Sequence, residues 1–256
     1  MNTLELEKYF DELIPTMLSC DWDNDGLMCS SDSKKEVKSA LLTLDVTENA
    51  VEKAIELGVD AIFTHHPFVF KGMKSVTDKN ARARLLISLL YHGISVFSYH
   101  TRLDTVGGGV NDILADRIGL KNVVPLGDGE LSMARVGDID SLPFDLFADN
   151  VKSKLKCPSL ILARSQTGNV WVKRAAVLGG SCNMDFIKGA IATGADVLVT
   201  GDASYNALID ANIDGLHVLC AGHYSSENPV LKYFENKLDD LGIRTYTYEC
   251  GYFEYI

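Results

Sequence analysis

The sequence lacks long apolar runs and any recognisable targeting segment. No hydrophobic stretch in the 256 residues approaches the roughly 20 residues that a membrane-spanning helix needs. The first residues lack the basic and apolar regions of a secretory signal. We therefore expect a cytoplasmic protein that does not act on membranes.

Paired cysteines and an excess of basic charge are also missing. The six cysteines form no C-x-x-C pair and no zinc-finger spacing, which indicates reduced, mostly buried thiols. Lysine and arginine number 24 against 35 aspartates and glutamates, for a net charge of -11. Because nucleic-acid binding depends on basic side chains that neutralise phosphates, this charge argues against a nucleic acid as the partner. A small phosphorylated substrate stays compatible, since bound divalent cations would reverse the local charge.

What the sequence does contain is an internal repeat. Residues 54–64 recur as residues 190–200, with a glycine, an aspartate and a threonine at the same places. Val37–Ala40 recurs as Val172–Ala175. Each copy then carries a glycine, a short apolar run and a His-x-x-x-carboxylate motif. So many ordered matches indicate one α/β unit that is used twice.

Within the first copy, strands and helices are expected to alternate. Strands are expected at residues 40–44, 61–64 and 94–97, and helices at residues 47–57 and 81–91. This alternation predicts two similar α/β domains with mixed, largely parallel sheets flanked by helices. We place the domains at 1–125 and 126–256, and residues 226–256 could pack on the first. Further helices are expected over 4–18 and 144–155.

Four of the six histidines follow predicted strands, and two carboxylates each lie four residues after one of them. The resulting candidate ligands are His65, His66, His100, Asp104, His223 and Glu227. Because the carboxyl ends of parallel strands meet at one edge of a sheet, we expect these side chains on that edge. Two copies packed with their strand ends facing would join both sets into one metal site. His92 and His217 are expected to be structural.

Four imidazoles and two carboxylates are typical of a two-metal hydrolase. Such mixed ligands suit zinc, iron, manganese or cobalt better than magnesium or calcium, which prefer oxygen alone. A bridging carboxylate, Glu227 or Asp104, would hold two ions about 3.5 to 4 Å apart. A water between them would be the nucleophile.

Several other residues admit two interpretations. Gly179–Ser181 could bind an anion through backbone N–H groups or form a tight turn. Asp202 could contact a substrate or cap the helix that begins near Ser204. Asp45 could support a metal ligand or cap the next helix. Cys182 could be a nucleophile or simply a small residue beside a turn.

Eight ordered motifs, which run through nearly the whole chain, resemble those of the Nif-three-like dinuclear metal-centre family. Its members are often named GTP cyclohydrolase type 2 homologs. The motifs are Trp22–Leu27, Leu44–Asp45, Thr64–Phe70, His100–Asp104, Gly108–Asn111, Gly179–Ser181, Thr200–Asp202 and Gly222–Glu227. The middle of this chain is too short for the extra domain that some relatives carry. Many relatives also have a histidine where this chain has Tyr205 and Asn206.

The resemblance implies two similar α/β domains, a dinuclear metal centre in the cleft between them, and toroidal homohexamers. The metal ligands that it implies are His65, His66, Asp104, His223 and Glu227. His100 matches a residue beside the metals, with a supporting or proton-transferring role. Each subunit is thus expected to bind two divalent metal ions.

We therefore interpret the chain as a metal-dependent hydrolase of a nucleotide or related small molecule. GTP ring opening is the named candidate reaction, and His100 would move a proton. The alternative is a non-catalytic metal-binding scaffold, such as a metal chaperone or regulatory protein, since the same ligands would support it.

Overall fold

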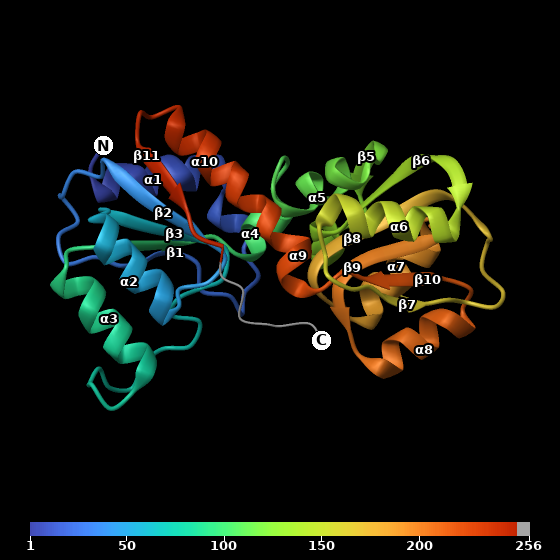
Figure 1. The fold of residues 1–256 in the computed structure, drawn as a ribbon, viewed down its shortest axis with the longest axis horizontal. Helices are drawn as coiled ribbons and strands as arrows, with labels where there is room; N and C mark the ends of the chain where they lie inside the picture. Colours follow the sequence, from blue (N-terminus) through green and yellow to red (C-terminus); the bar gives the residue numbers. More distant parts are fainter. Residues whose placement is uncertain (250–256) are drawn as a thin grey trace. The chain divides into compact units, whose positions relative to one another are not determined.

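The structure, a computed structural model, describes residues 1–249 (Figure 1). The described residues fold into two compact units, one built from residues 1–106 and 230–249, the other from residues 107–229. The change of unit thus falls at residue 107, whereas the sequence analysis put a boundary near residue 125. Residues 250–256, the end of the expected C-terminal segment, lie outside the described residues.

The first unit is built on a five-stranded sheet in the order β1-β4-β3-β2-β11. Its strands are β1 (Gly26–Cys29), β2 (Ser39–Thr43), β3 (Ala61–Thr64), β4 (Ser95–Ser98) and β11 (Arg244–Thr247). The last four strands of that order are parallel, and β1 runs antiparallel to β4. Because β11 pairs with β2, the C-terminal segment completes the first sheet.

Helices cover both faces of this sheet (Figure 1). They are α1 (Thr3–Leu13), α2 (Glu48–Leu57), α3 (Ala81–Tyr91) and α10 (Leu231–Asp239). The short helix α4 (Thr101–Thr105) follows the end of β4, and a 3-10 turn spans Thr16–Leu18. Apolar side chains of β2, β3 and β4 pack against α2 and α3. On the other face, Phe63 stacks on Phe97 and contacts Phe10 of α1 and Phe234 of α10. Helix α1 ends at Leu13, earlier than expected. The next residue, Ile14, precedes Pro15, and the residue before a proline disfavours helical geometry.

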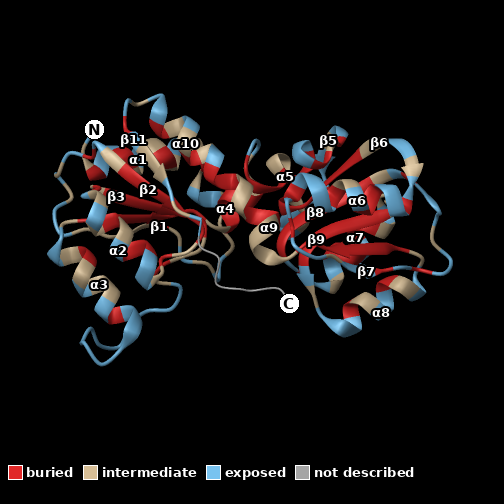
Figure 2. Cartoon of the chain, viewed as in Figure 1, coloured by how far each residue is buried: buried red, intermediate tan, exposed pale blue. Residues whose placement is uncertain are grey.

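The second unit is built on a six-stranded sheet in the order β5-β6-β8-β9-β10-β7. Its strands are β5 (Lys121–Pro125), β6 (Arg135–Pro143), β7 (Ile161–Ala163), β8 (Trp171–Cys182), β9 (Val197–Ala203) and β10 (His217–Cys220). Strands β8, β9 and β10 are parallel, and β5, β6 and β7 add antiparallel pairs. These central strands are the most continuously buried part of the unit (Figure 2).

Helices also flank this second sheet. They are α5 (Val110–Ile118), α6 (Phe144–Leu155), α7 (Met184–Ala192), α8 (Tyr205–Ile213) and α9 (His223–Glu227), with 3-10 turns at Gly129–Met133 and Asn228–Val230. Helices α5 and α6 pack their apolar faces on one side of β8, β9 and β10. The strands alternate side chains between faces, so the other side is left for α7 and α8.

The predicted fold class is confirmed. Both units carry the same core of three parallel strands, β2-β3-β4 in one and β8-β9-β10 in the other, flanked by helices. The repeat predicted from the sequence corresponds to these two cores. Among the described residues, no helix combines the length and apolar character needed to cross a membrane.

Candidate metal centre

Three histidines gather at one edge of the first sheet. His65 and His66 directly follow β3, and His100 follows the neighbouring parallel strand β4 by one residue. One ring nitrogen from each of the three lies within 4.8 Å of the others. Asp104, on α4, places a carboxylate oxygen 3.6 Å from Nε2 of the buried His65. The sequence expectation that these four side chains share a strand-end edge therefore holds within the first unit.

The paired histidines are both held through Nδ1. His65 Nδ1 lies 2.9 Å from the backbone carbonyl oxygen of Tyr99, and His66 Nδ1 lies 2.8 Å from a carboxylate oxygen of Asp45. An oxygen partner fixes the proton on Nδ1 and makes Nε2 the basic nitrogen, as is usual for histidines that bind metals. Helix α2 is capped by Thr47, so Asp45 is not its cap. The carboxylate of Asp45 instead supports His66.

His100 is held in the same way by the loop that precedes β1. Asp23 accepts a hydrogen bond from His100 Nδ1 at 2.9 Å and from the Thr101 backbone N–H and hydroxyl at 3.0 and 2.6 Å. Burial alone would raise the pKa of Asp23, but these hydrogen bonds outweigh it and hold the pKa well below its usual value. The loop thereby fixes the start of α4, which carries Asp104.

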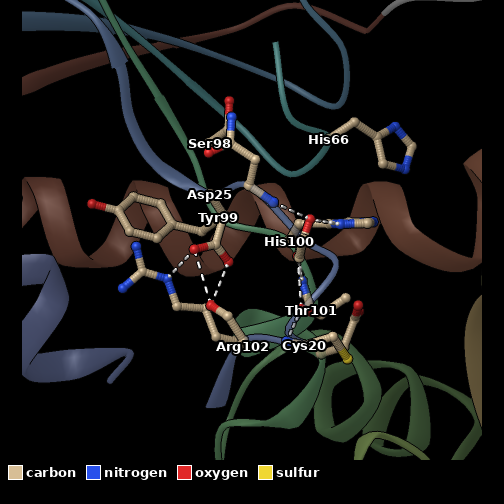
Figure 3. A network of polar contacts seen from close by, with 12 residues as sticks. Cys20, Asp25, His66, Ser98, Tyr99, His100, Thr101 and Arg102 are labelled. Carbon is tan, nitrogen blue, oxygen red and sulfur yellow. Dashed lines mark hydrogen bonds and ion pairs between the residues drawn. The ribbon is translucent and has the colours of Figure 1, made fainter. Parts of the chain in front are cut away.

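Arg102 anchors the same helix from inside the unit. Its side chain is only 1% exposed, and Nε lies 2.9 Å from Asp25 (Figure 3). Nη1 lies 2.7 Å from Asp11. The guanidinium also lies over the ring of Tyr99, 4.7 Å from its centre. The sequence analysis missed this anchor. The only available signal was an arginine between His100 and Asp104, together with unassigned carboxylates near the N-terminus.

A second group of ligand-type residues lies in the second unit. His223 and Glu227 lie one turn apart on α9, and His223 Nε2 is 3.2 Å from a Glu227 oxygen. The carboxylate of Asp202, on β9, lies 2.8 Å from His223 Nδ1 and accepts from the Ser181 hydroxyl. Helix α8 is capped by Ser204, so Asp202 supports a histidine instead of capping that helix.

The glycine pair before Ser181 has a role that the sequence analysis did not foresee. Gly179 and Gly180 continue strand β8, so the expectation of a tight turn is wrong. Their N–H groups donate to Asn111 and Ser226, which also rules out the expected anion cradle. A Cβ atom at Gly180 would collide with the Glu227 carboxylate and lie 3.3 Å from His223 Nε2. Glycine is needed here to leave room for Glu227.

The two His-x-x-x-carboxylate motifs are displaced by one residue within the repeat. The Tyr99 N–H donates to the Thr64 carbonyl, and the Ala221 N–H makes the matching bond to Thr200. By this register His100 corresponds to Gly222, whereas the sequence matched it to His223. His100 precedes α4 as its cap, but His223 is the first residue of α9. The motif match was therefore one residue out, and the two histidines have different places in the repeat.

The donor set fits divalent metal ions. Imidazole nitrogen and carboxylate oxygen bind such ions at about 2.0 to 2.2 Å, so two ligands of one tetrahedral ion lie about 3.4 Å apart. The His65–Asp104 and His223–Glu227 separations, 3.6 and 3.2 Å, bracket that value. Mixed nitrogen and oxygen donors favour zinc, iron, manganese or cobalt. The first unit thus offers a group of three histidines that could hold a metal ion, and the second unit offers a His–Glu pair of ligand type.

The lesser candidates have structural roles. Burial raises the pKa of the Cys182 thiol to about 12, so it stays protonated and is neither a nucleophile nor a ligand near neutral pH. His92 ends α3, and His217 lies in β10, where the Ser165 N–H donates to its Nδ1. Both histidines are structural, as expected.

Comparison with known proteins identifies the family. The sequence model described as Duf34/NIF3 (NGG1p interacting factor 3) matches residues 1–250. The chain belongs to the Duf34/NIF3 family. The resemblance found in the sequence motifs is thus confirmed.

Relatives in this family share both sequence and fold with the chain. A Clostridium perfringens protein named GTP cyclohydrolase 1 type 2 homolog is 34% identical over 90% of this chain and 88% of its own length. A Methanocaldococcus jannaschii protein of the same name is 33% identical over 93% and 95%. A crystal structure described as a Bacillus cereus protein related to NIF3 is 22% identical and aligns with a TM-score of 0.87 over 100% of this chain and 99% of its own.

Proposed function

We propose that this Duf34/NIF3 member is a metal-dependent hydrolase that binds two divalent ions through His65, His66, Asp104, His223 and Glu227. Its substrate is a nucleotide or a related small molecule, and ring opening of GTP is the candidate reaction. The names of the relatives support the choice of GTP. The composition of the two ligand groups supports the choice of a metal-dependent reaction.

The observation that carries this proposal is how the histidines are held. All four histidines of the two groups have Nδ1 against an oxygen, from the Tyr99 carbonyl or from an aspartate. One such contact alone does not mark a metal ligand, since Nδ1 of the structural His92 lies 2.8 Å from the Ser88 carbonyl oxygen. In the two groups the contact recurs at four histidines that also lie beside other ligand-type side chains. Histidines that bind metals combine these two features, because the outer oxygen fixes the ring and raises the basicity of Nε2.

The protein's own groups supply orientation and proton transfer. When bound, the ions would supply the Lewis acidity that hydrolysis needs. Asp23 holds His100 through Nδ1, which leaves Nε2 as its basic nitrogen. His100 can therefore accept a proton at Nε2 and return it to a leaving group. Asp45 and Asp202 keep their histidines in the binding orientation.

Metal content tests the ligand assignment. We expect the purified protein to hold two equivalents of a divalent ion by elemental analysis. His65→Ala and Glu227→Ala lie in different units, yet each should lower the affinity for metal about 100-fold or more, since a ligand is lost outright. His92→Ala, the same change at the end of α3, should leave the content unchanged. Equal loss from all three variants would contradict the assignment.

Turnover tests the hydrolase itself. The metal-loaded protein should open the ring of GTP, lose that activity in a chelator and regain it when the ion is returned. Retention of full activity without metal would reject the proposal. A protein that binds metal as described but turns over no nucleotide, phosphoester or cyclic amide would instead be a non-catalytic scaffold.

A further inference from the structure

One segment of the first unit has a charge opposite to that of the chain. Between Pro67 and Arg84 there are five lysines and arginines and a single aspartate, although the whole chain carries -11. The segment follows His66 directly and ends in the first turn of α3. A local excess of positive charge within an acidic protein favours an anionic ligand at this place.

The same segment encloses a cavity. Its volume is about 480 Å³, and its lining includes Lys71, Lys74 and Arg82 together with Phe70. Lys71 and Lys74 make no ion pair with any residue in the described part of the chain. The guanidinium of Arg82 donates to the Val46 carbonyl, which holds it in place. Three cations around one cavity of this size suit a ligand with several negative charges.

Phe70 connects this cavity to the histidine group. Its ring centre lies 6.4 Å from that of His100 and 6.2 Å from that of Trp22, and Trp22 in turn lies 6.2 Å from His100. Trp22 is 55% exposed and Phe70 is 44% exposed, so neither ring is committed to the core. Two accessible aromatic rings beside each other offer a surface on which a planar base can stack.

We propose that Lys71, Lys74 and Arg82 bind the phosphates of a nucleotide whose base stacks on Trp22 and Phe70. The inference deepens the proposed function, because it names the groups that would hold a nucleotide beside the histidines. The binding itself requires neither metal nor turnover. A base and its phosphates differ in chemistry, and the aromatic pair and the cationic cavity provide one surface for each.

Fluorescence of Trp22 tests the assignment in the full-length protein. With Trp171→Phe, Trp22 is the remaining tryptophan, and its emission should be quenched as GTP is added in the presence of a chelator. Lys71→Glu with Lys74→Glu should weaken GTP binding about tenfold or more, and added salt should weaken it further. Guanosine, which has no phosphate, should bind weakly and equally to both proteins. Phe70→Ala should weaken the binding of both GTP and guanosine.

The matched control is Lys79→Glu, in the same segment but outside the cavity lining. It should leave GTP affinity within about twofold, because this charge lies outside the lining and is screened by solvent. The proposal is overturned if Lys79→Glu weakens GTP binding as much as the double variant does, or if the double variant binds GTP as tightly as the wild type. It is also overturned if inorganic triphosphate binds as tightly as GTP, or if a single-stranded oligonucleotide binds far more tightly. GTP binding measured in the presence of a chelator would support this proposal even if the metal or turnover experiments failed.

Discussion

At the residue scale, the candidate centre depends on carboxylates that do not belong to the ligand set. Asp23, Asp45 and Asp202 each hold one histidine through Nδ1. An imidazole can rotate about two side-chain bonds, and ordering it at the moment of metal binding would cost free energy. Fixing the ring beforehand removes that cost, and outer partners of this kind change metal affinity by about 10- to 100-fold.

Gly180 makes the opposite contribution, by leaving space. We expect Gly180→Ala to displace the buried Glu227 carboxylate and lower metal affinity about tenfold or more. Gly194→Ala is the matched control, since Gly194 also has a positive φ, 72° against 68°, but its Cβ would meet nothing within 4 Å. Both variants should lose about 1 kcal/mol of stability from the backbone alone. Metal titration by calorimetry separates the two effects, and equal metal affinities would show that Glu227 does not need this space.

From the sequence, the candidate ligands could be named, but of their supports only Asp45 was offered, as one of two interpretations. Position at a strand end was enough to propose His65, and spacing from His100 was enough to propose Asp104. The partner of His100 could not be found in this way, because Asp23 lies 77 residues earlier and its approach depends on how the N-terminal loop packs. Tyr99 supports His65 with a backbone carbonyl, which leaves no trace in the residue type.

At the element scale, both copies of the repeat contain an aspartate whose hydrogen bonds join two neighbouring strands. Asp60 accepts hydrogen bonds from the backbone N–H groups of Lys38 and Ser39, at the start of β2. Asp196 accepts the matching pair from Lys173 and Arg174 in β8. In both units the aspartate thus fixes how the first strand begins beside the next. In the first unit, His65 and His66 follow the strand that begins beside Asp60.

Asp60 should make the stability of the first unit depend on pH. Burial alone would raise its pKa, but hydrogen bonds from Lys38 and Lys35 and the charge of Lys35 outweigh burial and lower it. Because the folded pKa lies below the unfolded value of about 3.9, the ionised carboxylate stabilises the fold above that pH. This stability is lost as the pH falls through the folded pKa. Asp60→Asn should therefore cost about 2 kcal/mol at pH 7, and the cost should shrink as the pH falls below about 4.

Urea unfolding of Asp60→Asn and wild type between pH 7 and pH 3 measures this difference. Asp116→Asn, an exposed change on α5, should leave stability unchanged across the same range. A destabilisation by Asp60→Asn that is the same at pH 3 and pH 7 would mean that the carboxylate charge plays no part.

The regular elements were largely predictable because apolar periodicity and caps fix them locally. Helices 81–91 and 144–155 and the strand 61–64 match α3, α6 and β3. Gly179–Ser181 was misread because a glycine pair usually marks a turn, whereas here tertiary packing against Glu227 requires glycine inside a strand. The one-residue displacement of His100 relative to His223 was also not predicted, because motif spacing cannot show where a helix starts.

At the scale of the whole molecule, one exposed surface of the second unit is unusually apolar. Tyr205, Ile209 and Ile213 are spaced by four residues on α8, and they are 76%, 41% and 72% exposed. Ile161 and Leu162 of β7, which α8 contacts, are also exposed. Contiguous apolar surface of this kind, in a chain with a net charge of -11, is typical of a protein–protein contact. We expect it to be covered by another copy of the chain.

The oligomeric state tests this expectation. The family resemblance implies a hexamer, so light scattering should give about six times the 28.0 kDa of one chain. Ile209→Glu with Ile213→Glu places two charges on the apolar surface and should give a smaller assembly, because burying unpaired carboxylates costs several kcal/mol. Leu146→Glu, at a single exposed apolar position on α6, should leave the mass unchanged. An unchanged mass for the double variant would show that the α8 surface lies outside the contacts between copies, and an equal loss in Leu146→Glu would show that the effect is not specific to α8.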